Sequence, residues 1–178
     1  MLSTPAVVRR TSESVSVALL GASETSTPVA WLSCTTSAVP VSAAPRCATT
    51  PHPSRPVRLV GACAARVTLI GSPALFVDGV AGVEVEGFTV RDSLIAARVE
   101  RAGVLTLRHA VLEANQRSAV QAVDPGTHVT LEDVVVRGTL PDPSTQTFGQ
   151  GLAASFAARL TLTDVEVTGS RETGVFLD

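Results

Sequence analysis

Apolar and polar residues alternate strictly in four short segments of this chain, and each segment is followed, after one small or polar residue, by a second alternating segment. The first segments are Val83-Glu84-Val85-Glu86, Leu105-Thr106-Leu107-Arg108, Val129-Thr130-Leu131-Glu132 and Leu160-Thr161-Leu162-Thr163. The second segments are Phe88-Thr89-Val90-Arg91, Ala110-Val111-Leu112-Glu113, Val134-Val135-Val136-Arg137 and Val165-Glu166-Val167-Thr168. A period of two is typical of β-strands with one buried face. The chain therefore repeats a unit of two strands.

Each repeat also contains a third apolar stretch. These stretches cover residues 74–77, 95–99, 119–123, 152–156 and 175–177. Equivalent positions Val83, Leu105, Val129 and Leu160 are 22, 24 and 31 residues apart. An earlier repeat begins at Val57, because residues 57–61 align on residues 83–87, and its second strand is expected at 67–70. Three short strands per repeat, with no helical period between them, predict an all-β, three-sided parallel solenoid of about four to five coils.

Stacked coils pair as parallel strands about 4.8 Å apart, so equivalent residues form columns. The inward columns are expected to contain Val83, Val85, Phe88 and Val90, whereas Glu84, Glu86, Thr89 and Arg91 are expected on the outer surface. The prediction requires Leu107, Leu131 and Leu162 to lie one above another. A β-sandwich would need hairpin turns such as Asn-Gly, and a leucine-rich repeat would need helices; the sequence has neither pattern.

Residues 57–178 resemble the right-handed parallel β-helix repeats of the pectin-lyase-like superfamily, especially its repeat-only bacterial members. The resemblance implies a right-handed, single-stranded β-helix. It implies little about activity, because this scaffold carries lyases, hydrolases, epimerases, adhesins and inert stalks. The hydrolase motifs Asn-Thr-Asp, Asp-Asp, Gly-His-Asp and Arg-Ile-Lys do not occur. Arg91, Arg117 and Arg137 have no acidic calcium cluster like that of pectate lyases, so no catalytic residue is carried over.

Residues 1–56 differ in composition from the repeats, since 25 of them are Ser, Thr or Pro and one is Gly. Such a composition favours an irregular or linker-like segment. An imperfect first coil is the alternative, with a strand at 15–18 and Pro-containing edge strands at 27–29 and 39–41. We therefore expect a segment 1–56 followed by a repeat domain 57–178.

Three cysteines, Cys34, Cys47 and Cys63, precede the clear repeats and show no metal-ligand spacing. Two interpretations stay open. One is a single disulfide with a leftover thiol in an oxidising compartment, and the other is a set of small buried residues.

Charge and aromatic content exclude some partners. The chain has 14 Arg, no Lys and 16 acidic residues, which gives a net charge of −2 and no basic field for nucleic acid. Five Phe, one Trp and no Tyr provide few stacking surfaces for single-stranded nucleic acid.

No apolar run approaches the roughly 18 residues of a membrane span. Residues 15–20 are too short and Ser-interrupted for a signal peptide core, so the expected extracellular or cell-envelope location depends on the resemblance.

One position between the first two strands of each repeat can carry chemistry. It is occupied by Gly87, His109, Asp133 and Asp164, so we expect a ladder of His109, Asp133 and Asp164 at one corner of successive coils. Neighbouring carboxylates can bind Ca²⁺ or act as an acid/base pair. These three residues are the candidate catalytic residues. The alternative is that short polar residues at the corner serve the local backbone.

The longest repeat owes its length to residues 138–151. Insertions in solenoids often form the binding surface. Asp142, Gln146, Phe148 and Gln150 are therefore candidates for contact with a glycan, through hydrogen bonds and one apolar ring. The alternative is a surface loop without a role, since solenoids tolerate insertions at low cost.

Together these patterns favour a non-catalytic β-helix repeat module of an exported or cell-envelope protein, structural or carbohydrate-contacting. A polysaccharide lyase, hydrolase or epimerase is the first alternative, and an adhesin or stalk that binds a cell-surface protein is the second. The last residues, 173–178, lie partway through a third strand. We therefore expect further coils, or a capping chain, beyond Asp178.

Overall fold

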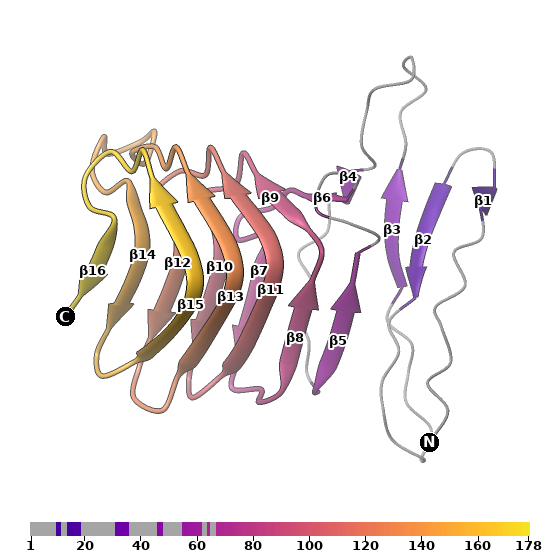
Figure 1. Cartoon of the computed structure of the whole chain (residues 1–178), viewed down its shortest axis with the longest axis horizontal. Helices are drawn as coiled ribbons and strands as arrows, with labels where there is room; N and C mark the ends of the chain where they lie inside the picture. Colours follow the sequence, from indigo (N-terminus) through magenta and orange to yellow (C-terminus); the bar gives the residue numbers. More distant parts are fainter. Residues whose placement is uncertain are drawn as a thin grey trace.

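The computed structural model describes residues 55–61, 64 and 67–178, together with the backbone of four strands that precede them. Within this part of the chain all regular structure is β-strand. The strands of the repeats stack in parallel as a β-solenoid of about five turns (Figure 1). The predicted all-β parallel solenoid is thereby confirmed.

Each coil has three sides. In the first coil the first two sides are β5 (Val57–Val60) and β6 (Thr68–Leu69), and in the second they are β8 (Val83–Glu86) and β9 (Thr89–Arg91). In the following coils one long strand forms both sides: β11 (Val104–Glu113), β13 (His128–Arg137) and β15 (Arg159–Thr168). The third sides are β7 (Leu75–Asp78), β10 (Ile95–Glu100), β12 (Ser118–Val123), β14 (Gln150–Ser155) and β16 (Val175–Leu177). The two predicted strands are thus continuous in three coils, because a single corner residue bends the chain and pairing resumes directly after it.

Parallel pairing keeps equivalent residues in register. Leu107 pairs with Leu131, and Leu131 pairs with Leu162. Val57 pairs with Val83, as expected from the alignment of the first repeat on the second. The predicted columns are therefore confirmed, including the column on which the solenoid prediction depended.

The core consists of the inward columns. Leu105, Leu107 and Leu131 are completely buried, and each strand alternates between buried and partly exposed residues. The alternation restarts after the corner, so both halves of a bent strand point their apolar residues inward. Full burial of one such side chain contributes about 1.5–3 kcal/mol. The prediction for Thr89 was wrong: its side chain is buried, and its hydroxyl donates a hydrogen bond of 2.7 Å to the carbonyl of Ala64.

A short column of polar side chains is buried after the second side. The Oδ1 atom of Asn115 accepts a hydrogen bond of 3.2 Å from the Ser93 amide, and its Nδ2 donates one of 3.1 Å to the carbonyl of Val90. Ser93 Oγ in turn accepts a hydrogen bond of 3.2 Å from the amide of Gly71. Buried polar side chains thus connect successive coils, a feature that the alternation did not predict.

Four strands are described before residue 55: β1 (Arg10–Thr11), β2 (Ser14–Ala18), β3 (Trp31–Thr35) and β4 (Arg46–Cys47). They pair antiparallel with one another, and β4 pairs in parallel with β6, so these strands extend the sheet without forming a parallel coil. The register places Cys34 opposite Cys47. Cys63 and the edge strands predicted at 27–29 and 39–41 lie outside the described residues, and the disulfide stays a prediction.

Candidate functional site

The corner between the first two sides of each coil is built from residues with a left-handed backbone. The angle φ is 74° at Gly87, 48° at His109, 52° at Asp133 and 52° at Asp164. Glycine adopts this conformation without a Cβ penalty, and Asp and His are enriched there among the other residues. The left-handed backbone alone therefore accounts for the residue types at this position.

Glycine at the first corners also allows two backbones to approach closely. A Cβ atom on Gly61 would lie 2.2 Å from the carbonyl oxygen of Gly87. Only from His109 onward does the corner have room for a functional side chain.

His109 and Asp133 form the one pair in the predicted ladder. The Nδ1 atom of His109 lies 2.8 Å from Oδ2 of Asp133, and the side chains are 58% and 69% exposed. This hydrogen bond raises the pKa of His109 above its ordinary value, and desolvation acts in the opposite direction. In the described part of the chain Asp164 forms no hydrogen bond or ion pair with either residue. The structure thus brings together two of the three predicted residues.

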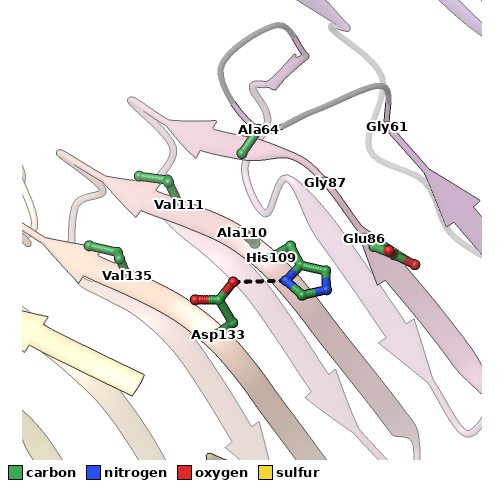
Figure 2. A pocket seen from close by; sticks show the side chains of 9 residues that line it. All are labelled: Gly61, Ala64, Glu86, Gly87, His109, Ala110, Val111, Asp133 and Val135. Carbon is green, nitrogen blue, oxygen red and sulfur yellow. Dashed lines mark hydrogen bonds and ion pairs between the residues drawn. The ribbon is translucent and has the colours of Figure 1, made fainter. Parts of the chain in front are cut away.

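A shallow, open groove of about 460 Å³ lies beside this pair. Figure 2 shows His109 and Asp133 pointing toward each other on adjacent strands, with Val111 and Val135 further along the same strands. The lining residues are Gly61, Ala64, Glu86, Gly87, His109, Ala110, Val111, Asp133 and Val135. The groove therefore combines one exchangeable proton, shared by an imidazole and a carboxylate, with an apolar floor.

Most other charged side chains on these two sides are engaged between coils. Arg108 contacts Glu84 at 3.6 Å and Glu132 at 2.5 Å, so it joins three successive coils. Glu113 bridges Arg91 at 3.7 Å and Arg137 at 2.5 Å in the same way. Glu86, at the edge of the groove, pairs with Arg58 at 3.0 Å.

The insertion at 138–151 uses its polar groups largely within itself. Asp142 is 6% exposed and accepts hydrogen bonds from the amide and hydroxyl of Ser144, at 2.8 and 2.5 Å. These bonds lower the pKa of Asp142. Gln146 Nε2 donates a hydrogen bond of 3.0 Å to the carbonyl of Pro143, and Gln150 is buried in β14.

Gln146 and Phe148 are the exposed candidates in this loop, and Phe148 offers the apolar ring. Its side chain is 38% exposed, and the guanidinium carbon of Arg117 lies 4.8 Å from the ring centroid. The Nε atom of Arg117 is buried without a hydrogen-bond partner in the structure. Sequence reasoning did not pair Arg117 with Phe148, because no local motif connects residues on adjacent coils.

The described residues contain neither a metal-binding cluster nor a membrane-spanning helix. Among them, no three His, Cys, Asp or Glu side chains are grouped so that they could hold a metal ion. In the same part of the chain, no helix has the length and apolar character needed to cross a membrane.

Comparison with protein-family models, curated proteins and solved structures found no match.

Proposed function

We propose that this chain is a non-catalytic β-helix repeat module of an exported or cell-envelope protein, with a structural role and a surface that contacts carbohydrate. The observation that carries the structural role is the pairing of outer charges from coil to coil. Arg108 and Glu113 each bridge two neighbouring coils, and both lie on outer sides where a substrate-binding enzyme would need free groups. Single surface ion pairs contribute little, but a network along the stack opposes separation of the coils.

The finer family assignment is part of this proposal. The parallel three-sided coils support the resemblance of residues 57–178 to the repeat-only members of the pectin-lyase-like superfamily. An extracellular or cell-envelope location follows from that resemblance and is proposed with it.

The carbohydrate contact would be made by Phe148. An exposed aromatic ring offers an apolar face to a sugar, and Arg117 on one side of this ring fixes its position. Retention of the protein in gels containing polygalacturonate or alginate would measure the contact. Phe148→Ala should reduce the retention severalfold, whereas Phe156→Ala should leave it unchanged, because Phe156 is exposed but stacks on no arginine in the described structure.

One observation favours a second function, catalysis on an acidic polysaccharide. His109 and Asp133 share a hydrogen bond beside a groove, an arrangement that could transfer a proton. The test is product formation from the same polymers by wild type, Asp133→Asn and Asp164→Asn. The scaffold proposal expects no cleavage by any of them. Cleavage by the wild type that is lost in Asp133→Asn and kept in Asp164→Asn would overturn it in favour of an enzyme.

A further inference from the structure

Arg117 is the one partly buried arginine in the described part of the chain whose guanidinium has no acceptor. The other two partly buried arginines are Arg98, which pairs with Glu100 at 2.8 Å, and Arg108, which pairs with Glu132 at 2.5 Å. The Nε atom of Arg117 is buried without a hydrogen-bond partner, and no described residue accepts a hydrogen bond from its Nη atoms, which reach the surface. A cation that is partly removed from water is unfavourable without a counter-charge, so this guanidinium lacks an anionic partner.

Asp142 is the acidic residue nearest to this role, but its carboxylate is already engaged. Its Oδ1 atom accepts hydrogen bonds from the amide and hydroxyl of Ser144, at 2.8 and 2.5 Å, and it forms no ion pair with Arg117. The hydrogen bonds from Ser144 lower the pKa of Asp142 most, and the charge of Arg117 adds a smaller contribution. The two charges are therefore near each other without direct contact, and the guanidinium keeps its donors for a group from outside the chain.

The loop holds Phe148 beside this guanidinium in a conformation that a bulky residue rarely adopts. The angle φ is 68° at Phe148 and 105° at Gly149. The amides of Gly149 and Gln150 both donate to the carbonyl oxygen of Arg117, at 2.9 and 3.0 Å, so the backbone of Arg117 anchors the segment that carries the ring. A left-handed phenylalanine is unfavourable, and such conformations persist where the surrounding structure holds them, which is often at a binding site.

The coil that follows is present at this corner, so the ring is not exposed for want of a neighbour. The amide of Glu172 on that coil donates a hydrogen bond of 3.2 Å to the carbonyl of Gly149. A Cβ atom on Gly149 would lie 2.9 Å from the Cβ of Arg171, so the two coils are in close contact. Phe148 is nevertheless 38% exposed. The ring and the guanidinium therefore lie together on the outer surface of two stacked coils.

An exposed ring beside an unpaired guanidinium fits a ligand that has both an apolar face and a negative charge. A pyranose ring can place its C–H groups on Phe148, and a carboxylate or sulfate group on the same sugar offers two oxygens to the guanidinium fork. We propose that Arg117 and Phe148 form one site for a sugar that carries such an oxyanion. This inference rests on the proposed carbohydrate contact and adds Arg117 as the residue that selects for charge.

Isothermal titration of the full chain with matched ligands tests this selection. Oligogalacturonate should bind roughly tenfold more tightly than its fully methyl-esterified form, because only the acid can pair with Arg117. Dextran sulfate and dextran provide the same comparison for a sulfate ester, so the pair that shows the preference identifies the oxyanion. The chain has a net charge of −2, so an acidic polymer gains no general attraction.

Arg117→Gln should abolish the preference, lowering the affinity for the acidic ligand to that of its neutral counterpart. Arg117→Lys should keep part of the preference, because it retains the charge without the fork. Arg159→Gln is the control and should keep the full preference, since Arg159 is an exposed arginine without an ion pair in the described structure. Circular dichroism checks that each variant is folded.

The outcomes separate this inference from the proposed carbohydrate contact. Equal affinity for acidic and neutral ligands, with both weakened by Phe148→Ala, would overturn the selection for charge and leave the contact standing. A preference that survives Arg117→Gln, or one that is lost equally in Arg159→Gln, would also overturn it. Absence of binding to all four ligands would overturn both.

Discussion

β13 and β15 have apolar residues at the same inward positions and pair in register, yet these inward residues differ in burial. Leu131 is completely buried, whereas Leu162, which stands directly beside it in the next coil, is 42% exposed. The difference lies in the number of neighbours, because β13 pairs with both β11 and β15, whereas among the described strands β15 pairs with β13 alone. In a solenoid the contribution of a residue to the free energy of unfolding therefore depends on the adjacent coil as much as on its own strand.

The largest expected effect comes from truncating these two leucines. Leu131→Ala should lower the free energy of unfolding by about 3 kcal/mol, because it removes buried surface and leaves a cavity between two coils. Leu162→Ala should cost about 1 kcal/mol, because part of that side chain already contacts water. Urea denaturation followed by circular dichroism measures both. Equal losses of unfolding free energy in the two variants would show that the stabilisation by an inward leucine does not depend on a second neighbouring coil.

The second largest effect is expected at Asn115, whose buried side chain is hydrogen-bonded to the preceding coil. Asn115→Ala should lower the free energy of unfolding by about 2 kcal/mol, since it removes the hydrogen bonds to the Ser93 amide and the Val90 carbonyl. Gln116→Ala is the matched control, because Gln116 is the next residue and its contact with Ser93 is made by the backbone amide. If Asn115→Ala lowers the free energy of unfolding no more than the control does, water takes over the hydrogen bonds of the Asn115 side chain.

The ion pairs on the outer surface should have a smaller effect. Glu113→Gln weakens contacts to Arg91 and Arg137 on the two neighbouring coils, and we expect a loss of about 0.5–1 kcal/mol at low salt. Glu172→Gln, at an exposed residue without an ion pair in the described structure, should change little. The loss should shrink in 1 M salt, where exposed charges are screened. A loss that is independent of salt would attribute the effect to packing of the Glu113 side chain.

The columns could be predicted from the sequence because a period of two fixes which residues face inward, and the repeats fix which residues stack. Leu107 above Leu131 follows directly from these two rules. Thr89 could not be predicted, since its burial depends on a hydrogen bond to Ala64, outside the repeating strands. Asn115 was missed because its partners lie on the preceding coil.

The candidate sites show the same limit. Stacking correctly predicted that His109, Asp133 and Asp164 occupy equivalent corners, but it does not determine side-chain rotamers, and the hydrogen bond joins only the first two. In the insertion, Asp142 is used by the amide and hydroxyl of Ser144. Backbone amides in a loop need acceptors, and a nearby carboxylate supplies one before it can serve a ligand.

The smallest expected effect is a change in the pKa of His109. It distinguishes the corner at Asp133, which is bonded to His109, from the corner at Asp164. The hydrogen bond to Asp133 raises the pKa of His109 in the folded state above the value of 6.5 expected for the unfolded chain. The stabilisation it provides is therefore fully present below about pH 6.5 and is lost as the pH rises through the higher pKa of the folded protein. Asp133→Asn keeps a residue suited to the left-handed backbone but removes the charge, so the pKa of His109 measured by NMR should fall toward 6.5. Asp164→Asn makes the same change at the next corner, where no histidine is bonded, and should leave that pKa unchanged. Equal shifts in both variants would mean that His109 responds to the overall charge of the surface, and that the pair at the groove is not a specific one.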